Sequence, residues 1–210
     1  MRTAALALLL EWAPVLAAAE LPPATPQSLA RDLGAKFQKL HDAQGLSGAF
    51  TQKKQLAGIA RPLVSGGQFL FVRGKGILWH TQTPFDSEFV LTERRMTVTE
   101  SGNVALAMQT AEHPGLRLVS DLFLALFALD FDALGRHFDL FAAAGTPWRI
   151  GLAPRDAALR VVATRIELKG DAAVSEVVLE DAHGDRTQIV LDGVKHLKTI
   201  TPAEAERFGP

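Results

Sequence analysis

The 210-residue sequence contains no cysteine and no tyrosine, and it lacks an excess of charge of either sign. Without cysteine there can be no disulfide, no thiolate nucleophile, no cysteine-bound zinc and no iron–sulfur cluster. The 22 Lys and Arg residues oppose 23 Asp and Glu residues, which gives a formal net charge of -1. A balanced charge provides no broad positive field, so we expect no nucleic acid as a partner.

The patterns of common catalytic and metal sites are also missing. There is no Gly-x-Ser-x-Gly elbow, and Asp130 and Asp132 are better interpreted as a helix-capping pair than as a catalytic dyad. The six histidines are scattered, without the spacing of a zinc motif; they are His41, His80, His113, His137, His183 and His196. We therefore expect a protein that is not an enzyme and that needs no metal or cofactor.

The first 19 residues have the pattern of a secretory signal peptide. Arg2 is followed by a seven-residue apolar run, Ala4 to Leu10, and by small residues at Ala17 to Ala19. The apolar run is far shorter than the roughly 20 residues that a membrane-spanning helix needs. We predict Sec-type export with cleavage after Ala19, although Glu11 interrupts the signal, and a linker at residues 20–27.

The next segment predicts an N-terminal helix followed by short strands. Leu29, Leu33, Phe37 and Leu40 recur at helical spacing, and we expect Ser28 to cap this helix. The period then changes to two, with turn residues between the segments. The predicted strands are Leu46–Lys53, Gln68–Arg73, Gly76–His80, Glu88–Thr92, Arg95–Glu100 and Val104–Gln109.

Leu116 to Leu134 interrupts the strands with an insertion that is hydrophobic on nearly all sides. A helix of this kind must be buried on more than one side. We expect one short helix from Asp121 and a second near Asp130 and Asp132, with a corner between them. Strands then resume at Phe138–Ala142, Trp148–Leu152, Ala158–Leu168, Val174–Glu180 and Thr187–Leu191.

These elements predict an α+β fold in a single domain at residues 28–200, with a C-terminal tail at 201–210. About 11 strands would form an incomplete, half-open antiparallel β-barrel. The N-terminal helix and the short apolar helices would cover its inner face as a lid. A hydrophobic space between sheet and lid would suit an apolar ligand.

Several motifs resemble the LolA-like family of outer-membrane lipoprotein carriers. They include Gly48 to Lys53, Gly66 to Arg73, Leu78-Trp79 with Pro84, and the later Trp148, Leu152 and Pro154. The resemblance covers roughly residues 28 to 200, and the order and spacing of these short motifs carry it. It implies a periplasmic monomer that shields lipoprotein acyl chains between an inner-membrane donor complex and an outer-membrane acceptor protein, without doing chemistry.

The resemblance also implies a role for Arg73, which lies six residues before Trp79. In the family an arginine at this position holds the lid by hydrogen bonds, so we expect Arg73 to latch the lid. The chain departs from the family pattern at Gly74, where proline is usual, at Thr92 to Asn103, where an aromatic hairpin is usual, and at Val194 to Pro210, where an aromatic, proline-containing strand is usual. These departures leave a free lipid or an acylated biosynthetic intermediate as an alternative cargo, and a lipid-responsive periplasmic sensor as a further alternative function.

Nine apolar residues are candidates for the wall of the predicted cavity. Burying one methylene contributes roughly 0.8 kcal/mol, so a long acyl chain gains on the order of 10 kcal/mol in a dry cavity. Each residue taken singly also fits an ordinary core position. The candidates are Phe50, Phe69, Phe71, Trp79, Phe89, Leu122, Phe123, Leu126 and Phe127.

Overall fold

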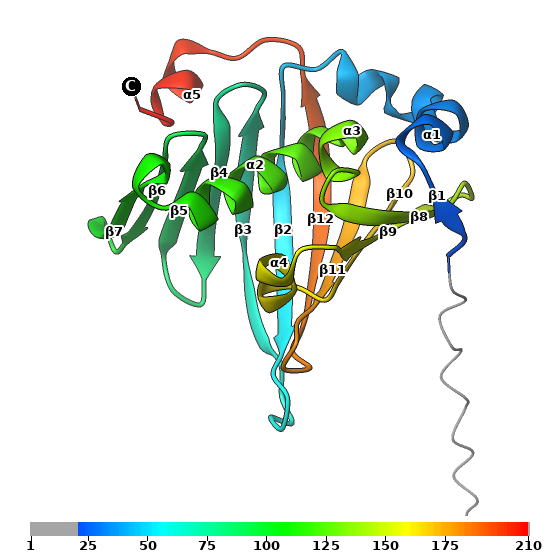
Figure 1. Cartoon of the computed structure of the whole chain (residues 1–210). Helices are drawn as coiled ribbons and strands as arrows, with labels where there is room; N and C mark the ends of the chain where they lie inside the picture. The colour runs from blue at the N-terminus through cyan, green and yellow to red at the C-terminus, as the bar shows by residue number, and fades with distance from the viewer. Residues whose placement is uncertain (1–20, 210) are drawn as a thin grey trace, which may run out of the picture.

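The computed structural model describes residues 21–209, which form one curved antiparallel sheet with helices across one face (Figure 1). The sheet has 12 strands in the order β1-β8-β9-β10-β11-β12-β2-β3-β4-β5-β6-β7. The first meander is β2 (Gly45–Gln55), β3 (Leu63–Val72), β4 (Gly76–Thr83), β5 (Ser87–Thr92), β6 (Arg95–Glu100) and β7 (Asn103–Gln109). The second group is β1 (Pro23–Ala24), β8 (Phe138–Ala143), β9 (Trp148–Pro154), β10 (Arg165–Gly170), β11 (Val174–Glu180) and β12 (Arg186–Leu197).

The two meanders join where the last strand, β12, pairs with β2. Their register runs from Arg186 opposite Gln55 to Leu197 opposite Gly45. The edges of the sheet are β1 and β7, so the sheet curls without closing on itself. This confirms the predicted half-open antiparallel sheet with helical cover, with 12 strands in place of about 11.

Helices occupy the concave side and one end of the sheet. α1 (Pro26–His41) and α5 (Pro202–Glu206) lie at one end of the molecule, the β2–β3 turn lies at the other, and α4 (Ala157–Val162) lies between α2 and that turn (Figure 1). α2 (Pro114–Ala128), preceded by the 3-10 helix η1 (Thr110–Glu112), crosses the face of the sheet and leads into α3 (Phe131–Leu134). None of the helices formed by residues 21–209 is long and apolar enough to cross a membrane.

α1 buries the predicted apolar stripe, Leu29, Leu33, Phe37 and Leu40. Its start differs from the prediction, because Thr25 rather than Ser28 is the N-cap. The Thr25 hydroxyl accepts a hydrogen bond from the Ser28 backbone N–H, and the Ser28 hydroxyl accepts one from the Thr25 N–H. Such a reciprocal box satisfies two helix donors, and Pro26 fits the first turn because it has no N–H to leave unpaired.

The segments expected as linker and tail are structured where they are described. Residues 23–24 form β1 against β8, and this short strand accounts for the extra strand. Near the C-terminus α5 has its own capping box, and Phe208 is buried against β3 to β5. The predicted signal peptide lies outside the described residues.

The predicted strand Ala158–Leu168 is wrong in its first half. Residues 157–162 form α4, and only Arg165–Gly170 continues as β10. The prediction rested on apolar residues on both faces, but Val161 and Val162 of α4 are 68% and 56% exposed. Short apolar runs fit a helix or a strand equally well, and tertiary contacts decide between them.

The lid also begins earlier than predicted, at Pro114 rather than near Asp121. Asp121 lies inside α2, where Arg117 precedes it by one helical turn. The predicted corner is confirmed: α2 ends at Leu129 in the left-handed conformation (φ 49°), and the Asp130 side chain accepts a hydrogen bond from the Ala133 N–H at 2.9 Å. We call α2 and α3 together the lid.

Candidate ligand-binding cavity

A large apolar cavity lies between the lid and the concave face of the sheet. We call it the main cavity, and its volume is about 490 Å³. Typical small-ligand sites span roughly 300–1,000 Å³, so the main cavity is of ordinary size for a ligand. Its 24 lining residues come from α2 and α3, from β2, from β4 to β6, from β8, from β10 to β12, and from α4 and the residues beside it.

Polar groups in the main cavity are concentrated at one end. Gln52, Lys54 and Thr187 line it where β2 pairs with β12, towards the hairpin turns of both strands. The Lys54 ammonium is 3.6 Å from the Asp185 carboxylate, so this cation already has a partner. The arrangement offers a polar end and a long apolar interior, which suits an amphipathic molecule.

Chemistry at this site has little support from its side chains. No group of three or more His, Cys, Asp or Glu residues that could hold a metal occurs within residues 21–209. The lining side chains are almost all hydrocarbon, which cannot act as a nucleophile or general base. What such a surface can do is exclude water from a hydrophobic guest.

Six of the nine candidate wall residues line the main cavity. They come from two sides: Trp79 and Phe89 from the sheet, and four residues of α2. Within the aromatic cluster, Trp79 and Phe127 are packed edge to face, with ring centroids 6.5 Å apart. The structure therefore brings together Trp79, Phe89, Leu122, Phe123, Leu126 and Phe127.

The other three candidates lie behind or beside this wall. Phe50 stacks on Trp79 at 3.9 Å between centroids, and Phe71 packs against Phe127 at 5.8 Å. Both are buried core residues outside the lining of the main cavity. Phe69 lines a second, smaller pocket.

Sequence reasoning missed the wall opposite Trp79 and Phe89. β10 to β12 contribute every second residue to the main cavity, as period-two alternation requires. That alternation was visible in the sequence, but only the pairing of β12 with β2 places these strands across the cavity from β4 and β5. The missed residues are Ile166, Val177, Leu179, Ile189 and Leu191.

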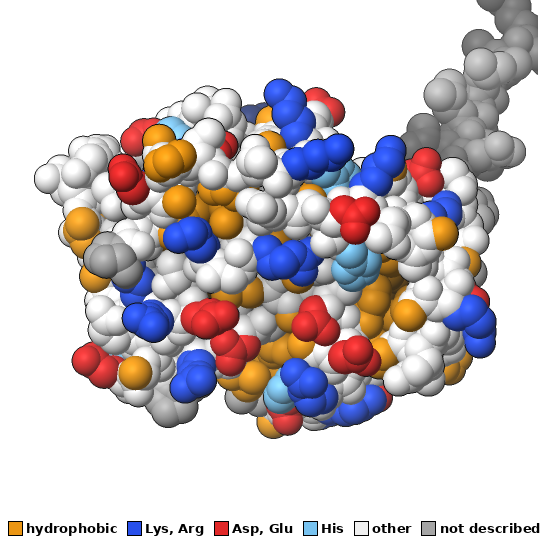
Figure 2. All heavy atoms as spheres, turned by 90° about the horizontal axis from the view of Figure 1, so that it is seen from above, with side chains coloured by type: hydrophobic (Ala, Val, Ile, Leu, Met, Phe, Trp, Pro, Cys, Tyr) orange, Lys and Arg blue, Asp and Glu red, His pale blue; other side chains and the backbone are white. Residues whose placement is uncertain are grey.

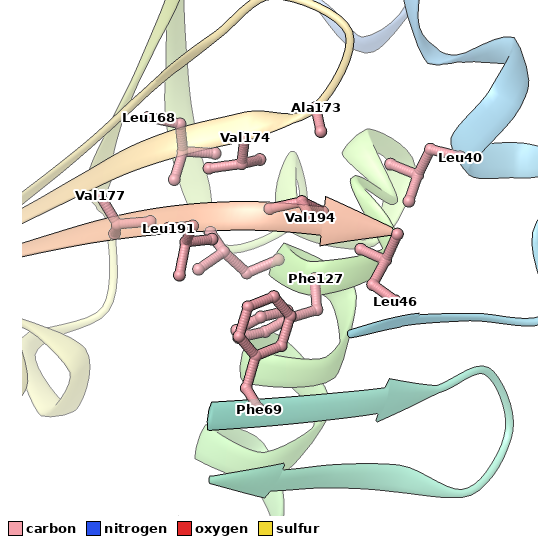
Figure 3. A pocket seen from close by; sticks show the side chains of 11 residues that line it. Leu40, Leu46, Phe69, Phe127, Leu168, Ala173, Val174, Val177, Leu191 and Val194 are labelled. Carbon is pink, nitrogen blue, oxygen red and sulfur yellow. The ribbon is translucent and has the colours of Figure 1, made fainter. Parts of the chain in front are cut away.

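The second pocket, which we call the inner pocket, lies towards the end of the molecule that carries α1 (Figure 3). It is small, with a volume of about 30 Å³. Leu126 and Phe127 of α2 and Val177 and Leu191 of the sheet line both cavities. The remaining residues of the inner pocket are Leu40, Leu46, Phe69, Leu168, Ala173, Val174 and Val194.

Arg73 lies at the end of α1. Its Nη2 donates to the Leu40 carbonyl at 3.1 Å, and its backbone N–H donates to the Gln44 carbonyl. The helix end leaves carbonyls without intrahelical partners, and a guanidinium suits them because its donors form a fork. α1 in turn meets the lid through Phe37 and Phe131, whose ring centroids are 5.8 Å apart.

Charged residues form ion pairs on the outside of the sheet. Across β9 to β12, on the face opposite the main cavity, Arg149 bonds Glu167 at 2.8 Å and Lys169 bonds Glu176 at 3.1 Å. Burial opposes ionisation of Glu176, but hydrogen bonds from Gln188 and Lys169 outweigh it and lower its pKa. At the end with α1 and α5, basic and acidic side chains are interspersed (Figure 2).

The sequence matches a family model over residues 41–205, and that family is described as outer membrane lipoprotein carrier protein LolA. The chain belongs to the LolA family. The match spans most of the sheet and both helices of the lid, so the cavity described above lies within the LolA domain. No curated protein matches the sequence.

Solved structures resemble this LolA-family chain at low sequence identity. A LolA superfamily protein from Nitrosomonas europaea is 10% identical, with 81% of this chain and 95% of that chain covered and a TM-score of 0.43. LprF from Mycobacterium bovis is also 10% identical, with 86% and 98% covered and a TM-score of 0.40.

Proposed function

We propose that this protein is a non-enzymatic carrier that shields the acyl chains of lipoproteins in its main cavity while they move between membranes. The observation that carries the proposal is the cavity itself: about 490 Å³ of space under a helical lid, lined by hydrocarbon and polar chiefly at one end. Membership of a family described as lipoprotein carriers supports the same cargo.

The energetics of such a cavity suit carriage. Each buried methylene contributes roughly 0.8 kcal/mol, so a long chain held away from water gains on the order of 10 kcal/mol at most. Part of that gain is offset by the lost freedom of the chain and by ordering the lid. Release then requires the lid to move, because the apolar walls hold the chain equally well at both membranes.

The setting we propose is the periplasm. The signal-like residues 1–19 and the family description support this location. The partners would be an inner-membrane donor complex and an outer-membrane acceptor protein, and the carrier would act as a monomer with Arg73 restraining its helical cover.

A free lipid or acylated intermediate is the second candidate cargo, and one observation favours it. Lys54, Gln52 and Thr187 place a cation and two hydrogen-bonding groups at the polar end of the main cavity. The anionic head of a fatty acid or phospholipid would bind these groups and share Lys54 with Asp185, whereas the acyl chains of a lipoprotein are attached to a protein.

Mass spectrometry of lipid that co-purifies with the protein tests the proposal. We expect acyl-bearing species to be retained by the wild type and lost from Ile189→Asp, which puts a carboxylate on the cavity wall. Val190→Asp is the matched control: Val190 is the next residue of β12, points to the opposite face and is 42% exposed.

Acylated protein fragments among the retained species would support lipoprotein cargo, and free lipids would support the second candidate. Equal lipid in the wild type and Ile189→Asp would contradict both, since it would place the lipid outside the main cavity. Turnover of ester substrates by the purified protein would contradict the proposed absence of enzyme activity.

A further inference from the structure

The inner pocket is separated from the main cavity only by side chains. Four residues, Leu126, Phe127, Val177 and Leu191, line both spaces. At about 30 Å³ the inner pocket has room for roughly two water-sized groups. All the side chains that line the inner pocket are apolar, so they offer no hydrogen-bonding partner to a polar group of a ligand.

Phe127 stands at the boundary between the two spaces. Its ring contacts an aromatic cluster, with centroid distances of 6.0 Å to Phe69, 5.8 Å to Phe71 and 5.3 Å to Phe123. In Figure 3 the Phe127 side chain lies beside Phe69, facing the side chains that β12 and β2 contribute. Shortening Phe127 would therefore join the inner pocket to the main cavity.

The polar end and the inner pocket lie at opposite ends of the same path along β12. Thr187 belongs to the polar end, Ile189 and Leu191 line the middle, and Val194 lines the inner pocket. The seven steps from Thr187 to Val194 span at most about 23 Å of strand, with a register shift after Asp192, and this is comparable with the length of a long extended acyl chain. A chain whose head stays at Lys54 would reach the inner pocket with its methyl end.

We propose that the inner pocket is a subsite for the methyl end of an acyl chain, and that Phe127 limits the longest chain that the protein holds. This inference rests on the proposed function, because it presumes an acyl cargo in the main cavity. It adds a specificity-determining residue and a closed end to that site. An acyl chain that is too short to reach Phe127 stays in the main cavity, and a longer chain must displace the Phe127 ring.

The test measures the affinity of the delipidated protein for laurate, myristate, palmitate, stearate and arachidate. Affinity should rise about fourfold per buried methylene until the space is filled, and then level off. We call the chain length at which the affinity stops rising the plateau. We expect Phe127→Ala to move the plateau to a longer acid, by at least one member of the series. Phe127→Leu, a milder change, should move it in the same direction if the alanine variant folds poorly.

A second substitution shows whether the gained space is the inner pocket. Ala173→Leu fills that pocket from the β10–β11 turn and should return the plateau of Phe127→Ala to the wild-type position. Phe123→Ala is the matched background, since Phe123 precedes Phe127 by one turn of α2 and lines only the main cavity. In that background Ala173→Leu should leave the plateau where it is.

An equal effect of Ala173→Leu in both backgrounds, or none in either, would overturn the subsite while leaving the carrier function intact. Failure of the wild type to bind any of the five acids, together with an absence of co-purified acyl species, would overturn the carrier function and the subsite with it.

Discussion

The sequence identifies Arg73 as a candidate functional residue, but it does not identify the group that accepts a hydrogen bond from Arg73. The sequence predicts that Arg73 holds the lid. In the structure its guanidinium donates a hydrogen bond to the Leu40 carbonyl at the end of α1. The link from α1 to the lid then passes through Phe37 and Phe131. The latch remains a prediction, now with a stated path from Arg73 through α1 to α3.

We expect Arg73→Leu to trap the lid or stop cargo release, because the Leu40 carbonyl loses the guanidinium and keeps only the Ala43 N–H, so β3 no longer holds the end of α1. The loss of one hydrogen bond from a charged donor should lower the free energy of unfolding by about 1–2 kcal/mol. Transfer of labelled acyl cargo from pre-loaded protein to acceptor vesicles measures the effect. Lys75→Leu removes a nearby cation from the same turn as a control, and unchanged transfer by Arg73→Leu would refute the latch.

Among the wall residues, sequence reasoning separated apolar from polar positions well but could not tell lining from core. Phe50 and Phe89 both point to the concave face, yet Phe50 is covered by Trp79 and Phe89 meets the main cavity. The difference depends on the side chain that lies above each position, which for Phe50 is Trp79 of β4. Periodicity reports the face of the sheet, and it does not report what lies above it.

At the scale of elements, the corner between α2 and α3 is the joint of the lid. Leu129 is buried and left-handed, a conformation that costs a non-glycine residue free energy and that the surrounding contacts must hold. Asp130 then caps α3 through the Ala133 N–H. The pair Asp130 and Asp132, expected to cap a helix, thus divides: Asp130 is the cap, and Asp132 lies in the first turn.

Asp130→Ala should loosen this corner, since the α3 N-terminus loses its side-chain acceptor. The expected cost is about 1 kcal/mol in the free energy of unfolding, measured by urea denaturation. Asp132→Ala is the control, because Asp132 can contribute only its charge near the helix N-terminus, worth about 0.3–1 kcal/mol. Equal destabilisation by the two variants would show that charge rather than capping holds the corner.

α4 is the element that the sequence pattern misassigned. Its apolar residues resemble the start of a strand that is buried on both faces, but they form a helix beside the main cavity in which Leu159 is buried and Val161 and Val162 are exposed. A short apolar run fits a strand and a helix about equally well, so contacts with distant segments determine which of the two forms. A local pattern has no access to those contacts.

On the scale of the whole molecule, the open sheet and its lid enclose the apolar walls of the main cavity. A ligand that binds the folded protein alone stabilises it in proportion to its occupancy. We therefore expect palmitate, added to delipidated protein at about one hundred times its dissociation constant, to raise the free energy of unfolding by about 2.7 kcal/mol. Denaturation with and without palmitate measures this.

Ile189→Asp serves as the control for that measurement, because its carboxylate occupies the apolar wall and should abolish stabilisation by palmitate. Stabilisation of the wild type and this variant to the same extent would mean that palmitate binds elsewhere on the protein. The comparison also separates specific binding from a general effect of an amphiphile on the unfolded chain.

The sequence by itself determined the alternation of the strands, the apolar stripe of α1, the hydrophobic insertion that forms the lid, and the lack of common catalytic motifs. Each of these is a local property of the order of side chains. Only the tertiary structure determined which apolar faces lie opposite one another and which carbonyl accepts the hydrogen bond from Arg73. It also determined that Phe127 lies between two cavities. Those features depend on pairing β12 with β2 across more than a hundred residues and on how much volume the enclosed side chains leave unfilled.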